Sequence, residues 1–162
     1  MSVDLIVEDA RWKRLNLFSI ANAAFEETLS QLNLRSENFI CCILACSSEK
    51  IKGLNAQFRG KNNYTNVLSF PSKAENYDTK SSLKFKANAD PLELGDIAIA
   101  YDVCKKEADV SKIKFEDHVY HLIIHSVLHL LGYDHEEEIN AAEMEKIEVQ
   151  VLANLGISNP YL

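Results

Sequence analysis

Three histidines in the C-terminal third of the sequence have the spacing needed to bind one metal ion. His125 and His129 are four residues apart, so on a helix of about 3.6 residues per turn they lie on the same face. Gly132 ends such a helix and lets the chain turn back, which brings His135 within reach of the same ion. Three imidazoles leave a coordination position open for water, as in catalytic zinc sites. We therefore predict one Zn²⁺ per chain, bound by His125, His129 and His135.

The same spacing occurs in zinc peptidases, which makes a protease the first alternative. Such a peptidase needs a glutamate directly after the first histidine as its general base, and here that position is Ser126. A serine hydroxyl cannot accept that proton at neutral pH. The methionine turn expected beneath the metal is also missing, because Met144 falls within the pattern of the last helix. Both differences argue against peptide hydrolysis.

The two remaining histidines, His118 and His121, precede the ligand pair on the same helix face. Both lie too far from Gly132 to join the three ligands. His121 is one turn before His125, so it is a candidate to orient a ligand or a bound phosphate, with a packed or surface histidine as the alternative. For His118 the packed or surface interpretation is favoured.

The elements that must position these residues follow an α+β order. Apolar or alternating segments predict strands, and apolar residues spaced three and four apart predict helices. The predicted strands are Val3–Val7, Asn38–Cys46, Val67–Phe70 and Leu94–Ala100, and the predicted helices are Trp12–Leu32, Ser48–Arg59, Asp102–Val110, Phe115–Leu131 and Ile139–Leu155. The polar segment 72–91 is predicted to be a long connection. We expect about four strands and about five helices.

Size and composition fit one domain over residues 1–162. The chain has 162 residues, of which 47% are hydrophobic and 25% charged, so it can bury a core. No apolar segment reaches the roughly 18 residues that a membrane span needs, and the N-terminus lacks the pattern of a secretory signal. The four cysteines form no C-x-x-C pair and are interpreted as buried free thiols. We expect a cytoplasmic protein without membrane contact.

The net charge is −7, but the charges are unevenly distributed. Segment Lys50–Lys86 has eight basic and two acidic residues, whereas Leu131–Leu162 has seven acidic residues and one lysine. A local basic surface attracts phosphate groups whatever the total charge. By itself the pattern favours two solvated faces, and it permits RNA binding without establishing it.

Several blocks of the sequence resemble the YbeY family of bacterial endoribonucleases. His125–His135 is similar to the family signature H-G-x-L-H-L-x-G-Y-D-H. Leu54–Arg59 and Thr65–Pro71 are similar to the blocks L-N-x-x-Y-R and T-D-V-L-S-F-P. Leu94–Ile97 matches a third block, and Leu155–Tyr161 matches a fourth. The resemblance covers nearly the whole chain in the family's order.

This resemblance implies a zinc-bearing single domain in which a small mixed sheet packs with helices, with a metal cleft at the end of the histidine-bearing helix. It implies single-strand-specific cleavage of RNA in the maturation of the 3′ end of small-subunit ribosomal RNA, and a role in ribosome quality control. The expected partners are ribosomal RNA and the ribosome or ribosomal proteins. We expect no DNA partner.

Arg59 matches the arginine that the family places in the cleft, and the resemblance makes it the candidate catalytic residue. A guanidinium can hold a phosphate through two hydrogen bonds and offset the charge that develops on phosphorus. Asp96 is a candidate carboxylate behind the metal ligands, with structural capping as the alternative. No general base is identifiable from the sequence.

Two positions depart from the family pattern. Asn66 stands where aspartate is usual, so any role that needs a carboxylate is lost while hydrogen bonding is kept. Ser126 stands where glycine is usual, and we expect it either to narrow the cleft or to donate to a backbone carbonyl one turn earlier. Neither departure removes a metal ligand.

Two other functions stay open at this level. A single metal is unusual for phosphodiester cleavage, for which two-metal sites are common. The chain could therefore be a metal-stabilised ribosome-assembly factor that binds RNA and proteins with little turnover of its own. Hydrolysis of a different small substrate at the same site is the other possibility. Intact ligands and an open coordination position favour the enzyme.

Overall fold

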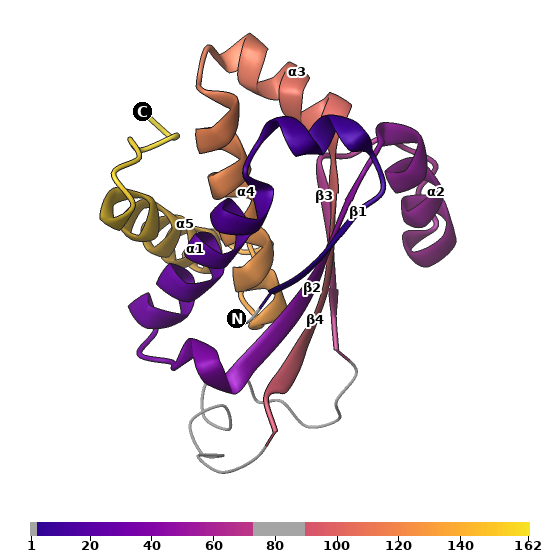
Figure 1. The fold of residues 1–162 in the computed structure, drawn as a ribbon. Helices are drawn as coiled ribbons and strands as arrows, with labels where there is room; N and C mark the ends of the chain where they lie inside the picture. The colour runs from indigo at the N-terminus through magenta and orange to yellow at the C-terminus, as the bar shows by residue number, and fades with distance from the viewer. Residues whose placement is uncertain (1–2, 73–89) are drawn as a thin grey trace.

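A four-stranded sheet organises the computed structural model, which describes residues 3–72 and 90–162 (Figure 1). The sheet order is β1-β2-β4-β3; β1, β2 and β4 are parallel, and β3 runs antiparallel along β4. The strands are β1 (Val3–Val7), β2 (Phe39–Cys46), β3 (Val67–Pro71) and β4 (Leu92–Ala100). Pro71 is tolerated in β3 because an edge strand can leave a backbone position unpaired.

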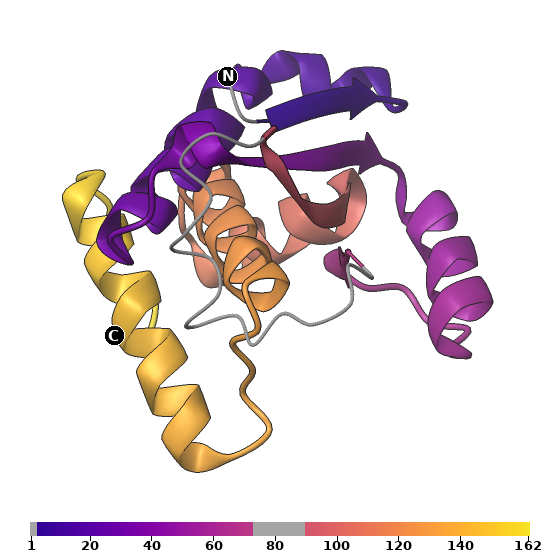
Figure 2. The same ribbon diagram turned by 90° about the horizontal axis from the view of Figure 1, so that it is seen from below.

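Five α-helices surround this sheet within the described ranges: α1 (Leu17–Gln31), α2 (Ser48–Arg59), α3 (Tyr101–Ser111), α4 (Phe115–Leu130) and α5 (Glu138–Asn154). Helices α1, α4 and α5 lie on one side of the sheet and α2 lies on the other (Figures 1 and 2). The expectation of a mixed sheet of about four strands with about five helices in one α+β domain is confirmed.

The first helix is shorter than its apolar pattern predicts. Asn16 accepts a hydrogen bond from the Ser19 backbone N–H at 3.4 Å and caps the start of α1. The preceding residues form a separate 3-10 helix, Ala10–Arg14. Trp12 in this 3-10 helix is fully buried and donates from Nε1 to the Cys46 carbonyl oxygen at 2.9 Å. The predicted Trp12–Leu32 helix is therefore wrong at its start. Trp12 is buried like the apolar residues of α1, so the apolar pattern runs on through residues where the backbone leaves the α-helix.

The apolar side of α4 packs in the larger of two hydrophobic cores. The main core lies between the sheet and the helices α1, α4 and α5, and a smaller core lies beneath α2. Side chains of β4 alternate between them, with Ile97 and Ile99 in the main core and Ala98 and Ala100 in the smaller one. Helix α4 is buried along most of its length, and each large apolar side chain so buried contributes about 1.5–3 kcal/mol. Its histidines occupy the remaining, partly exposed face.

The cysteines agree with the sequence interpretation. All four are free, and three are buried. Burial raises the pKa of Cys41 to about 12 and the pKa of Cys46 to about 11, so both thiols stay protonated at neutral pH and are poor metal ligands. None of the helices within residues 3–72 and 90–162 has the length and apolarity to cross a membrane. The predicted connection over 72–91 falls mostly outside the described residues.

Candidate metal centre

The C-terminal end of α4 turns back as the glycine predicts. Gly132 has a φ of +97°, a conformation that strains other residue types. Its N–H donates to the His129 carbonyl oxygen at 3.0 Å, and the Tyr133 N–H donates to the Leu128 carbonyl oxygen at 3.0 Å. These bonds satisfy carbonyls at the helix end and send the following chain back along α4. His135 thereby reaches the two helical histidines.

The three predicted ligands converge. One ring nitrogen from each of His125, His129 and His135 lies within 4.8 Å of the others. The Nε2 atoms of His125 and His129 are 3.0 Å apart, and the His135 ring lies 5.4 Å and 5.1 Å from the rings of His125 and His129, measured between centroids. The structure therefore brings together the group that the sequence singled out.

The other ring nitrogens of the helical pair show that the converging atoms fit a metal. Nδ1 of His129 donates to the Tyr133 carbonyl oxygen at 3.0 Å, since a carbonyl can only accept. Nδ1 of His125 donates to Oε1 of Glu148 at 3.0 Å. In neutral rings both Nε2 atoms then carry lone pairs, which repel at this separation unless a cation lies between them. The residues present thus suit a divalent metal with nitrogen ligands.

The electrostatics of His129 favour the same protonation state. Burial, followed by the charges of His125 and His135, lowers the pKa of His129 below its usual value. A neutral imidazole is the form that binds metal. The ring is therefore suited to coordination at neutral pH.

Glu148 on α5 contacts the candidate site, although no sequence motif had singled it out. Its side chain is only 1% exposed, and it accepts hydrogen bonds from His125, from His121 and, at 2.8 Å, from the Tyr161 hydroxyl. Burial alone would raise the pKa of Glu148, but the hydrogen bonds from His121 and His125 outweigh it and lower the pKa to about 2. The interpretation of the acidic C-terminal part as a solvated face is therefore wrong at Glu148.

A sequence signal for Glu148 did exist. The residue falls in the apolar stripe of α5, between Met144 and the pair Val151 and Leu152, all of which are buried. A carboxylate at such a position must find buried partners. The stripe can be read from the sequence, whereas the partners on α4 cannot.

The remaining histidines behave differently. His121 contacts Glu148, so it lies directly behind a predicted metal ligand. His118 is packed away from the three ligands, and its Nε2 lies 3.1 Å from Oε1 of Glu107 on α3. Glu107 also accepts from Nδ2 of Asn66 at 3.0 Å, so the amide at this position does make a hydrogen bond, as expected for asparagine in place of aspartate.

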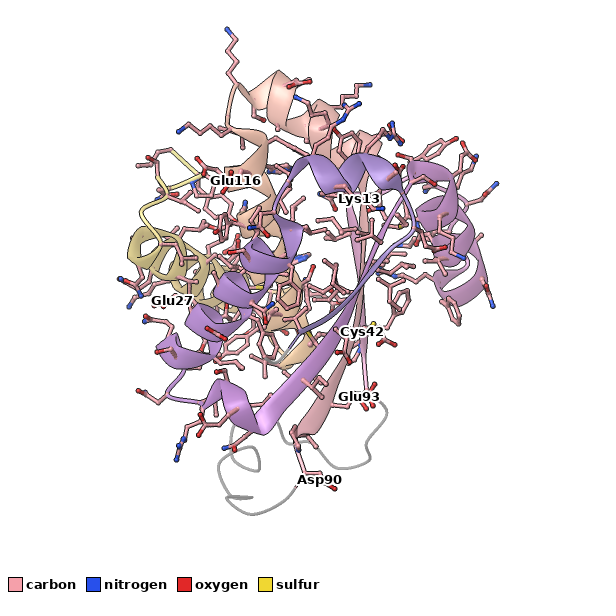
Figure 3. The ribbon with its side chains drawn as sticks, viewed as in Figure 1. Lys13, Glu27, Cys42, Asp90, Glu93 and Glu116 are labelled. Carbon is pink, nitrogen blue, oxygen red and sulfur yellow. The ribbon has the colours of Figure 1, made fainter. Side chains whose placement is uncertain are left out.

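Arg59 and Asp96 are not brought to the histidines. Arg59 is the exposed last residue of α2, on the other side of the sheet, and no hydrogen bond or ion pair within the described ranges joins it to them. Asp96 precedes Ala98 by two residues on β4 and shares its face, away from α4. Its register partner Cys42 projects from the sheet on the side away from α4 (Figure 3). Asp96 therefore cannot support the ligands from this position.

Ser126 fits neither of the expectations for it. The side chain is fully buried on the core side of α4, so it does not narrow a cleft beside the histidines. Its hydroxyl has no hydrogen-bond partner within residues 3–72 and 90–162, so it does not donate to the preceding turn. The substitution places a small polar group in the core without altering the metal-binding face.

Fold and site define the class: a single-domain α+β protein with three converging histidines that could hold a metal ion at the end of a central helix. The family model described as Endoribonuclease YbeY matches residues 6–156. The chain therefore belongs to the YbeY endoribonuclease family.

Individual relatives agree with this assignment. Proteins named Endoribonuclease YbeY from Ruegeria sp. (strain TM1040) and Jannaschia sp. (strain CCS1) are 44% and 40% identical to it, over 100% and 99% of this chain and 97% and 100% of theirs. The solution structure of TM1509 from Thermotoga maritima is similar with a TM-score of 0.56 at 21% identity, covering 95% of this chain and 91% of that one. At that identity the likeness concerns the fold alone.

Proposed function

We propose that the protein is a zinc-dependent, single-strand-specific endoribonuclease of the cytoplasm. Its substrate would be ribosomal RNA, at the 3′ end of the small-subunit RNA, and it would also act in ribosome quality control on the ribosome or its proteins. Membership of a family described as endoribonucleases supports RNA cleavage. The observation that carries the metal dependence is the convergence of three imidazole nitrogens within 4.8 Å.

The chain's own residues would divide the work as follows. His125, His129 and His135 would hold the ion, while Glu148 and the Tyr133 carbonyl fix the ring orientations of the helical pair. A bound zinc ion would supply a Lewis acid and an activated water for phosphodiester cleavage. Arg59 would hold a phosphate through its guanidinium.

The position of Arg59 sets a requirement on the substrate. The edge strand β3 contacts both α4 and α2, so an RNA strand bound at the histidines and at Arg59 must pass along this edge. Lys61 follows Arg59 just beyond the end of α2, and Lys50 and Lys52 lie near the start of the same helix, so α2 and its C-terminal end add positive charge along this path. A single strand can follow such a path more easily than a stiff duplex.

The decisive experiment compares Arg59→Ala with Lys61→Ala in single-turnover RNA cleavage at saturating RNA. Arg59→Ala should slow the saturated step by about 10²-fold or more, because it removes a preorganised charge from the transition state. Lys61→Ala should weaken binding in a salt-dependent way and leave that step unchanged. Zinc content should be normal in both variants. Equal behaviour of the two would reduce Arg59 to part of the basic surface.

An assembly factor with little turnover is the second candidate. Within residues 3–72 and 90–162 the structure has one cluster of three potential metal ligands, and Arg59 does not contact it. Cleavage of RNA by wild type that chelation abolishes and His129→Ala lacks supports the nuclease. RNA binding without any such cleavage supports the assembly factor.

A further inference from the structure

One buried carboxylate joins three separate elements behind the metal ligands. Glu148 comes from α5, His121 and His125 come from α4, and Tyr161 comes from the C-terminal tail, residues 156–162. Oε1 of Glu148 accepts from His125, whereas Oε2 accepts from Tyr161 at 2.8 Å and from His121. One carboxylate oxygen of Glu148 thus contacts His125, and the other contacts the C-terminal tail.

The tail has a defined path to this carboxylate. Gly156 has a φ of +78° and reverses the chain after α5, and the Ile157 N–H donates to the Leu152 carbonyl oxygen at 2.8 Å. Figure 1 shows the tail turning back from α5 towards α4. Residues 157–160 line a cavity of about 80 Å³ together with Asp117, His118 and His121 of α4. The tail is therefore packed on the helix that carries the ligands.

A carboxylate that is 1% exposed needs these donors. Ionised and removed from water, it loses stabilisation unless its oxygens accept several hydrogen bonds. If the Tyr161 hydroxyl is absent, Oε2 keeps His121 as its donor and the carboxylate gains freedom to rotate. The hydrogen bond that Oε1 makes to His125 then loosens, although His125 itself is untouched.

We propose that Tyr161 is a positioning residue of the metal centre: by holding Oε2 of Glu148, it keeps Oε1 on His125 and the other nitrogen of His125 directed at the ion. The C-terminal tail is in this sense a working part of the site. The inference rests on the three-histidine metal centre of the proposed function, but it does not depend on RNA cleavage. The ion that the centre would bind is a divalent metal ion, and the test uses Zn²⁺.

Tyr161→Phe tests this with little disturbance, because it removes the hydroxyl and retains the ring. That ring packs edge to face against His121, with 5.5 Å between the ring centroids. We expect zinc affinity, measured by competition with a chromophoric chelator, to fall about 3–10-fold. That is less than the 10–100-fold typical of removing a direct partner of a ligand, because Tyr161 acts through Glu148. The matched control is Tyr64→Phe, which removes a hydroxyl that donates to the exposed Glu49 far from α4 and should leave affinity unchanged.

A second measurement needs no metal. Nitrogen-15 spectra of the histidine rings in metal-free protein should show His125 with its proton fixed on Nδ1 in wild type and Tyr64→Phe, and a mixture of tautomers in Tyr161→Phe. If wild type binds no zinc, the proposed metal dependence fails, and this spectrum still decides the role of Tyr161.

Unchanged zinc affinity together with an unchanged His125 spectrum in Tyr161→Phe would overturn the proposal. A variant that merely unfolds at a lower temperature, by the same amount with and without zinc, would also overturn it. In that case Tyr161 only anchors the tail.

Discussion

Histidines of helix α4 contact two carboxylates, Glu148 and Glu107, that differ in their surroundings. Glu148 is 1% exposed, accepts from two histidines and a tyrosine, and so contacts His125, a predicted metal ligand. Glu107 has a side chain that is 40% exposed, and it accepts from His118 and Asn66. In both, burial raises the carboxyl pKa and hydrogen bonds from the partners outweigh it, so the pKa is lowered on balance, and the lowering is large only at Glu148.

The comparison teaches what separates a site from a structural contact. His118 and Glu107 form a partly buried pair between α3 and α4, in which Nδ1 of His118 has no partner within the described ranges. His125 contacts Glu148 through Nδ1, and its Nε2 converges with ring nitrogens of two other histidines. Convergence of Nε2 of His125 with the nitrogens of two other histidines, more than the histidine–carboxylate contact itself, makes this pair the candidate for metal binding.

The largest difference is expected between the histidines themselves. His129→Ala removes one of the three converging ligands and should abolish stoichiometric zinc binding, whereas His118→Ala should retain about one zinc per chain. Elemental analysis of protein purified without added metal measures both. Chelation should lower the stability of wild type and of His118→Ala but not that of His129→Ala, because bound metal ties α4 to the segment beyond Gly132. Zinc retained by His129→Ala would erase the distinction between the two regions.

The two carboxylates should differ next. Glu148→Gln weakens the acceptor on His125 and should reduce zinc affinity by about 10–100-fold, whereas Glu107→Gln should leave it unchanged. Chelator competition measures both variants. An equal loss in the two would show that the effect comes from general weakening of α4 packing.

Glu148→Gln and Glu107→Gln should also differ in how the free energy of unfolding depends on pH. Because the pKa of Glu148 is lowered to about 2 in the folded state, its contribution to the free energy of unfolding is present above about pH 4.5 and is lost as the pH falls towards 2. Urea unfolding of metal-free wild type should show this loss, and Glu148→Gln should show less of it. Glu107→Gln should keep most of the wild-type dependence, since its carboxyl is partly solvated.

The fold and the convergence of the three histidines could be predicted because both depend on local pattern. Strand β1 matches its predicted range because its apolar residues alternate. Helix α2 matches because helical periodicity marks its length and Gly60 marks its end. The ligand histidines are close in sequence, so helix geometry alone brings His125 and His129 together.

The rest of the site depends on tertiary packing. Glu148 and Tyr161 reach α4 from 23 residues or more along the chain, and no periodicity specifies that α5 and the tail pack there. Asp96 does not reach the histidines, because a strand residue faces one of two sides of the sheet, and only the observed register assigns Asp96 to the α2 side. The role of Arg59 stays a prediction for a different reason: its expected partner is an RNA strand and not another residue of the chain.

The smallest expected effect concerns Asn66, which belongs to the Glu107 region. Its Nδ2 donates to Glu107 at 3.0 Å, and its Oδ1 accepts from the Val67 N–H at 2.7 Å. Asn66→Asp keeps the second bond but replaces the first with two facing carboxylates. We expect metal-free protein at pH 7 to lose about 1 kcal/mol of unfolding free energy, the scale of one hydrogen bond, measured by urea denaturation. The loss should shrink as the pH falls and one carboxylate becomes protonated, and zinc affinity should stay at the wild-type value. A changed zinc affinity would mean that the Glu107 region is coupled to the metal centre after all, and that the two regions of α4 act as one.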